Sequence, residues 1–136
     1  MSAATDYLEE ALIRHIFRTG VFDKPTALWV ALFTEMPSDS DTGTEVSGNG
    51  YARVQHGPAD DKWTAPTGGS GETSNIGVIT FPAPIGNWGQ VIGGGVFDAP
   101  VGGNLLLRGV LPVPRTVEGG APAPVFAQGD MIWRVA

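Results

Sequence analysis

One amphipathic pattern near the N-terminus predicts the only helix that we expect in this chain. Thr5 is suited to cap its start, acidic residues follow, and Gly20 is suited to end it, so we predict a helix over residues 3–19. Ile13 and Phe17 widen the apolar surface, and the helix should therefore pack on a sheet or on a partner. The positions of one helical face, spaced i, i+3, i+4, i+7, are Leu8, Ala11, Leu12, His15, Ile16 and Thr19.

Beyond Pro25 the pattern changes to short apolar runs separated by glycine and proline, which is typical of strands joined by turns. The continuous run Ala27–Phe33 predicts a strand buried on both faces, with Trp29 in the core. The sequence Gly93-Gly94-Gly95 predicts a bulge or a close approach of two backbones. The other runs predict strands at residues 51–56, 76–81, 90–98, 105–111 and 131–135, a short strand near Trp63, and extended chain around 115–117.

This order of elements predicts the fold class. One helix followed by seven or eight strands favours a mainly β chain, an antiparallel β-sandwich or jelly roll with one N-terminal helix. A parallel sheet would need helices between its strands. The sequence has no internal repeat, and we expect residues 1–136 to form a single domain that builds its core without cysteine.

The charge of the chain narrows the classes of partner. The formal net charge is −6 and the eight basic residues are scattered, so the chain should repel phosphate groups. No apolar stretch approaches the roughly 20 residues that cross a bilayer, and no secretory signal pattern opens the sequence. We therefore expect neither nucleic acid nor a membrane as partner.

Residues that could carry chemistry occur in patterns that favour structural roles. His15 and His56 lack the HxH or HExxH spacing of metal or base sites, so we expect packing or surface roles and no loss of function when both are replaced. The adjacent carboxylates of Glu9-Glu10 and Asp60-Asp61 point apart, which favours solvent-facing charge. The glycine-rich stretches match no phosphate-binding motif.

Two further patterns leave alternatives open. Asp39–Glu45 resembles the start of a calcium loop, but Gly43 stands where an oxygen ligand is needed and flanking helices are missing, so a solvated loop is favoured over a cation site. Four tryptophans, Trp29, Trp63, Trp88 and Trp133, could line a sugar-binding groove, although among strands they are more often core or interface residues. We assign no catalytic, cofactor-binding or metal residue, and expect no enzyme.

The order of several short motifs carries a resemblance to a known family. The motifs are Leu28–Thr34, the string Gly43–Arg53, Asn75, Phe81-Pro82, Trp88-Gly89, Phe97-Asp98 and Gly102–Leu106. In this order, the chain resembles a family of small tailed-bacteriophage virion structural proteins that are often labelled tail fibre proteins, over about residues 7–135. It is also similar to the cement or decoration proteins of phage heads. Gly48, Asn49 and Gly50 suit a tight turn with positive φ, and Phe97-Asp98 with Gly102–Leu106 suits a hairpin.

The resemblance implies a protein that works by binding other virion proteins. Because the chain is short and has no shaft, the leading expectation is a capsid cement protein on the capsid exterior that binds and stabilises the shell of the major capsid protein. It would be made in the host cytoplasm and form a dimer or trimer. The alternative is a tail fibre or baseplate component, including a host-binding one. A carbohydrate-binding or hydrolytic module ranks third.

Overall fold

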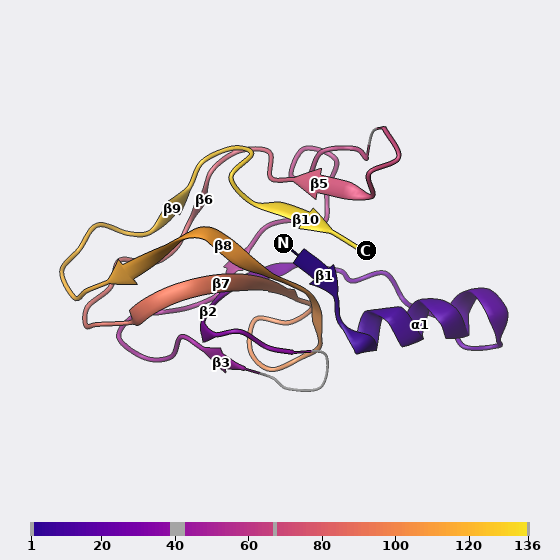
Figure 1. Cartoon of the computed structure of the whole chain (residues 1–136), viewed down its shortest axis with the longest axis horizontal. Coiled ribbons are helices and arrows are strands. Elements are labelled where there is room, and N and C mark those ends of the chain that lie inside the picture. The colour runs from indigo at the N-terminus through magenta and orange to yellow at the C-terminus, as the bar shows by residue number, and fades with distance from the viewer. Residues whose placement is uncertain (1, 39–42, 67, 136) are drawn as a thin grey trace.

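The computed structural model describes residues 2–38, 43–66 and 68–135, and it is mainly β with one helix, as predicted (Figure 1). The strands pair antiparallel, consistent with a β-sandwich that carries an N-terminal helix. In chain order the elements are β1 Ser2–Ala4, α1 Asp6–Phe17, β2 Trp29–Glu35, β3 Thr44–Glu45, β4 Val54–Gln55, β5 Glu72–Ser74, β6 Ile79–Thr80, β7 Gly89–Phe97, β8 Leu105–Val117, β9 Val125–Phe126 and β10 Ile132–Arg134.

The strands form two layers. The larger layer is a six-stranded sheet in the order β1-β8-β7-β2-β3, with β4 also pairing to β2. The smaller layer consists of two separate two-stranded ladders, β10-β5 and β6-β9. Figure 1 shows both ladders on the same side of the larger sheet.

The hydrophobic core lies between these layers. The larger sheet contributes its inward side chains, and the ladders with their flanking residues contribute Ile79, Phe81, Phe126, Met131 and Trp133. Residues 30–33 of β2 are at most 1% exposed, which confirms the predicted fully buried strand. The prediction for Trp29 was wrong, because this residue is the first of β2 and is only half-buried there.

The glycine triplet of β7, Gly93-Gly94-Gly95, allows the neighbouring strands to approach closely, as predicted. The register between β7 and β8 shifts between Val91 and Gly93, which marks a bulge. A Cβ atom at Gly93 would lie 2.7 Å from the carbonyl oxygen of Gly109 in β8. At Gly95 it would lie 2.9 Å from a ring carbon of Phe33 in β2. Side chains at these positions would therefore collide with both neighbouring strands.

Four strands, β1, β3, β5 and β9, were not predicted. Each has two or three residues, which is too short for an alternating pattern to stand out. Two predicted strands, 51–56 and 76–81, are reduced to the two-residue β4 and β6. Near Trp63, where a short strand was predicted, an isolated bridge pairs this residue with Asn75.

The helix is shorter than predicted. Thr5 caps it as expected, since the Leu8 N–H donates to the Thr5 hydroxyl at 3.4 Å, while that hydroxyl donates to the carbonyl of Leu105 at 2.6 Å. Residues 3–4 belong to β1 instead. The helix ends at Phe17 because Arg18 takes an extended backbone, so Gly20 is not its cap.

Candidate interaction surfaces

The string Gly43–Arg53 folds into a buried ionic clamp. The Arg53 guanidinium donates to both carboxylate oxygens of Glu45, at 2.8 and 2.9 Å, and to the carbonyls of Ala99 and Gly102, each at 2.8 Å. It also lies 3.5 Å from the ring centre of Phe97. Only 7% of the Arg53 side chain is exposed. We call this arrangement the Arg53 clamp; it joins β3 to the end of the β7–β8 hairpin.

Tyr51 extends the clamp into the core. Its hydroxyl donates to Glu45 at 2.7 Å and accepts from the Leu32 N–H at 3.0 Å. Burial raises the pKa of the Tyr51 phenol far above its usual range, so the group stays a neutral donor. The preceding turn has positive φ at Gly48, Asn49 and Gly50, as predicted. The hydrogen bonds of Glu45, Tyr51 and Arg53 tie this motif to β2 and to the β7–β8 hairpin, so the motif stabilises the fold.

Other residues that carried the resemblance also form hydrogen bonds to other parts of this chain. Asn104 donates its backbone and side-chain N–H groups to the Asp98 carboxylate, at 2.7 and 3.0 Å, which closes the predicted β7–β8 hairpin. Asn75 is fully buried, and its side chain donates to two carbonyls and accepts from the Met131 N–H. These contacts hold the start of β10 against the end of β5.

His56 is buried against the segments that carry Lys62, Trp63 and Ile76. Its Nε2 lies 3.1 Å from the carbonyl oxygens of Lys62 and Ile76, so it carries the hydrogen and donates. Its ring meets Trp63 edge-on, and the Trp63 indole donates to the His56 carbonyl at 2.8 Å. Burial lowers the pKa of His56 below its ordinary value of 6.5.

We expect His56 to make stability depend on pH. Because its pKa is lower in the folded than in the unfolded chain, the neutral ring's stabilisation is fully present above pH 6.5 and is lost as the pH falls through the folded-state value. Thermal unfolding of the wild type and of His56→Gln between about pH 8 and pH 5 measures this. The unfolding midpoint of the wild type should fall more steeply with falling pH than that of His56→Gln. Parallel curves for the wild type and His56→Gln would contradict the assignment.

The remaining chemical candidates are not gathered into one site. Glu9, Glu10, Asp60 and Asp61 are exposed. Of the loop Asp39–Glu45, positions 39–42 lie outside the described residues, and Glu45 is engaged in the Arg53 clamp. Within the described ranges, no three His, Asp or Glu side chains are grouped to hold a metal ion. No described helix is both long and apolar enough to cross a membrane.

The four tryptophans occupy separate places. Trp88 is buried beside Tyr51 and donates its indole N–H to the Asn49 carbonyl, and Trp133 is buried in the core. Trp29 and Trp63 are half-buried. Of the four, Trp133 lines the groove that is described below, with its ring mostly covered. Such a covered ring offers no open face on which a sugar could stack.

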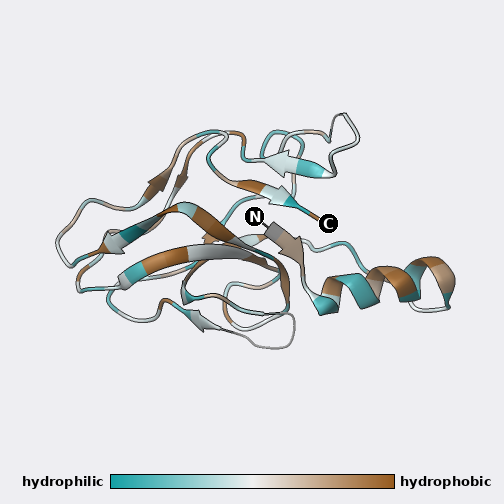
Figure 2. Cartoon of the chain, viewed as in Figure 1, coloured by the Kyte–Doolittle hydropathy of each residue, from teal (hydrophilic) through white to brown (hydrophobic). Residues whose placement is uncertain are grey.

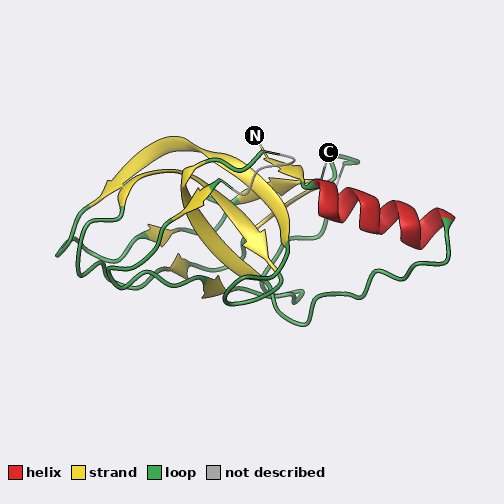
Figure 3. Cartoon of the chain, turned by 90° about the horizontal axis from the view of Figure 1, so that it is seen from below, coloured by secondary structure: helices red, strands yellow, loops and turns green. Residues whose placement is uncertain are grey.

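The helix forms a projecting arm with an uncovered apolar surface. We define the helical arm as α1 together with residues 18–22. Leu8 is the one residue of α1 that is buried, and it packs beside β1 and β8. Ile13, Ile16 and Phe17 are 55%, 67% and 79% exposed, and Val21 after the helix is 75% exposed. Figure 3 shows α1 extending away from the strands, and Figure 2 shows hydrophobic residues at its outer end.

Few of the described residues pack against the outer part of the arm. The return segment is held to the helix by the Phe22 N–H, which donates to His15 Nδ1 at 3.2 Å. A hollow of about 500 Å³ separates α1 from residues 20–26. A 12-residue helix is marginal in water without packing, and the exposed apolar side chains of α1 receive little of that packing from the described residues. The positions of Ile13 and Phe17 in the sequence predicted an apolar surface on the helix. They did not predict that this surface is exposed.

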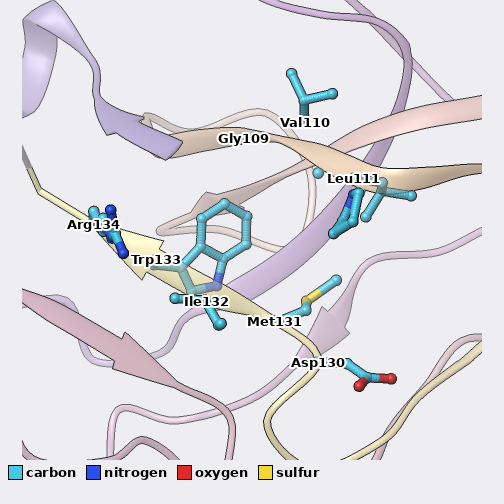
Figure 4. A pocket seen from close by; sticks show the side chains of 10 residues that line it. Gly109, Val110, Leu111, Asp130, Met131, Ile132, Trp133 and Arg134 are labelled. Carbon is cyan, nitrogen blue, oxygen red and sulfur yellow. The ribbon is translucent and has the colours of Figure 1, made fainter. Parts of the chain in front are cut away.

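A second candidate surface is a groove between β8 and β10, with a volume of about 290 Å³ (Figure 4). We call it the β8–β10 groove. Its two walls come from segments about 20 residues apart in sequence, so no local pattern could predict it. The lining residues are Gly94, Gly109, Val110, Leu111, Pro112, Asp130, Met131, Ile132, Trp133 and Arg134.

Comparison with known proteins gives one clear result. No curated protein matches the chain. A family model described as Podophage GP4 fiber I protein gp80 matches residues 3–134, almost the whole sequence. This match confirms the resemblance to phage virion structural proteins that the motif order indicated. The chain belongs to the family of Podophage GP4 fiber I protein gp80, a family of structural proteins of the phage virion.

Proposed function

We propose that this chain is a non-enzymatic structural subunit of the phage particle, and that it attaches to a neighbouring virion protein through its helical arm. The observation that carries the proposal is the exposed stripe of Ile13, Ile16 and Phe17 on a helix that its own fold leaves uncovered. These positions have the i, i+3, i+4 spacing of a helix that docks in an apolar groove. Aromatic side chains such as Phe17 are enriched in the buried core of protein interfaces.

The neighbour should be a groove on a different protein. The four exposed side chains of the arm offer on the order of 500 Å² of surface, whereas a stable dimer buries roughly 800 Å² on each copy. Two arms packed against each other would therefore hold a dimer weakly. A groove that surrounds the helix covers more of it and needs no symmetry.

The position in the particle has two candidates. The family description favours the fibre apparatus of the tail. The compact sandwich with one short arm, which has no repetitive shaft among its described residues, favours a cement protein that binds the major capsid protein on the capsid exterior. Electron microscopy of the virion separates the two. On the order of hundreds of copies on the shell would support the capsid position, and about a dozen or fewer at the tail would support the fibre position.

Replacing Ile13, Ile16 and Phe17 together by glutamine should remove the chain from the particle without unfolding it. Glutamine is a good helix former, and all three sites are exposed, so the urea midpoint should stay close to the wild type. We expect the number of copies per purified virion, measured by quantitative mass spectrometry, to fall by roughly tenfold or more.

Ile85→Gln is the matched control, since Ile85 is 81% exposed between β6 and β7 and lies outside both the arm and the hollow beside it. This variant should be incorporated normally. An unchanged copy number for the triple variant would overturn the proposed role of the arm.

A further inference from the structure

The turn at Gly48–Gly50 is tied to the segment that joins β6 to β7. The Asn49 carbonyl accepts from the Ile85 N–H at 3.0 Å and from the Trp88 indole N–H at 2.9 Å. The Asn49 side-chain amide donates to the Asn87 carbonyl at 2.8 Å. We call these three hydrogen bonds the Asn49 junction. Both the backbone and the side chain of Asn49 are therefore held by residues far along the chain.

The side chain of Asn49 is also held by close packing against Gly86. A Cβ atom at Gly86 would lie 2.5 Å from Asn49 Oδ1 and 2.6 Å from Asn49 Cγ. The φ of Gly86 is not positive, so its backbone admits a side chain and the neighbouring Asn49 atoms oppose one. Glycine at position 86 therefore leaves the space that the Asn49 side chain fills.

The same turn brings together the reactants of a spontaneous modification. Asn49-Gly50 is the one Asn-Gly pair of the sequence, and both residues are exposed to water. The backbone nitrogen after an asparagine can attack the side-chain amide, and glycine hinders this attack least because it has no Cβ. No described atom accepts from the Gly50 N–H, so no hydrogen bond has to break at the nucleophile.

The reaction is a deamidation. The Gly50 nitrogen bonds to Asn49 Cγ, the bond from Cγ to Nδ2 breaks, and the proton of the Gly50 amide leaves with Nδ2 as ammonia. Water then adds to the resulting five-membered imide and opens it, giving aspartate or isoaspartate at position 49. One water is consumed, one ammonia is released, and nothing is oxidised or reduced.

The Asn49 junction opposes this ring closure. The peptide that contains the Gly50 nitrogen is anchored through the Asn49 carbonyl, whereas the side-chain amide is anchored to the Asn87 carbonyl. Ring closure has to bring the Gly50 nitrogen and Asn49 Cγ from separate anchors to bonding distance, so at least one anchor has to break. The folded chain should therefore react mainly when the junction opens locally.

We propose that Asn49 is a site of spontaneous deamidation, and that the Asn49 junction restrains the reaction in the folded chain. The product has no side-chain N–H, so a carboxylate oxygen replaces the donor that faced the Asn87 carbonyl. Deamidation therefore adds a negative charge to an exposed turn and leaves the junction open. This inference does not depend on the proposed function.

The first test compares the folded and the unfolded chain. The purified protein is incubated at about pH 8 with and without denaturing guanidinium, and conversion at Asn49 is followed by peptide mapping with mass spectrometry. Conversion should be roughly tenfold faster, or more, in the unfolded chain, because the hydrogen bonds of the junction are lost. Equal rates would overturn the restraint. An unfolded chain that is not converted at Asn49 would overturn the site.

The second test opens the junction in the folded chain. Gly86→Ala pushes the Asn49 side chain off the Asn87 carbonyl, and it should raise the rate of conversion by roughly tenfold. The fold should persist, because the atoms in the way are the far end of one side chain. Gly120→Ala is the matched control: its φ of +81° strains a nearby turn, but nothing lies within 4 Å of its Cβ position. Equal rates for the two variants would overturn the restraint.

The third test mimics the product and does not require Gly86→Ala to fold. Asn49→Asp should lower the urea midpoint at pH 7, and part of this loss relative to the wild type should disappear at about pH 3, where the carboxyl group gains a proton and can donate again. Asn87→Asp is the control, since it adds the same charge nearby but keeps the acceptor for the Gly119 N–H. If Asn49→Asp is unchanged, or if both variants lose equally, the junction does not depend on the amide.

Discussion

Arg53→Ala should destabilise the chain by about 3–5 kcal/mol, the effect typical of removing one partner from a buried ion pair. The substitution removes the guanidinium from the Glu45 carboxylate, which keeps the Tyr51 hydroxyl as a donor, and from the carbonyls of Ala99 and Gly102. It also removes the cation from the Phe97 ring. Urea unfolding near neutral pH measures the difference. Arg53→Lys should recover only part of it, because lysine lacks the planar fork that binds two oxygens at once.

A second ion pair, which is exposed, serves as a control that distinguishes the effect of the buried Arg53 clamp from that of a surface ion pair. Arg14 and Glu10 also lie 2.8 Å apart, but their side chains are about 60% exposed on α1. Arg14→Ala should therefore change stability by less than about 1 kcal/mol. A double-mutant cycle of Arg53→Ala with Glu45→Gln should give a large coupling. Equal effects of the two arginine substitutions would show that the Arg53 clamp is not a buried pair.

Gly93→Ala should cost about 2–3 kcal/mol, the upper part of the range of about 1–3 kcal/mol that is usual for forcing extra volume into a packed region. The new Cβ would lie 2.0 Å from the Met36 sulfur, which can move, and 2.7 Å from the Gly109 carbonyl oxygen, which cannot without shifting β8. Gly102→Ala is the control, since nothing lies within 4 Å of its Cβ position and only its φ of +62° opposes a side chain. It should cost about 1 kcal/mol. If both substitutions have the same effect, the strands do not approach as closely as described.

The sequence predicted the elements that form because of their own local residue pattern, without contacts from distant parts of the chain. Helix α1 shows a 3.6-residue period and a capping threonine, and β2 is a continuous apolar run, so both could be found without knowing any partner. The turn at Gly48–Gly50 and the β7–β8 hairpin were found for the same reason, because glycine marks positive φ. Strands β1 and β9 exist only because distant strands pair with them, and Trp29 is half-buried only because β2 begins there.

The interaction surfaces were harder to predict than the fold. Among the residues that carried the family resemblance, Arg53 and Asn75 turn inward and Asp98 closes an exposed hairpin, so all three hold loops together. They therefore identify the fold and the family more directly than the partner. The apolar residues of the arm could be read from the helical pattern, but their exposure depends on where β1 directs the helix. The groove depends on the spacing between β8 and β10, which no local pattern encodes.

The two prolines of β8 have a consequence for the free protein before assembly. An open strand edge is a template on which identical chains can pair without limit, and this is how soluble proteins form fibrillar aggregates. Pro112 and Pro114 have no N–H to offer, so an edge-to-edge ladder between two copies would break at both positions. The two prolines therefore limit how far this edge of β8 can pair with the same edge of an identical chain.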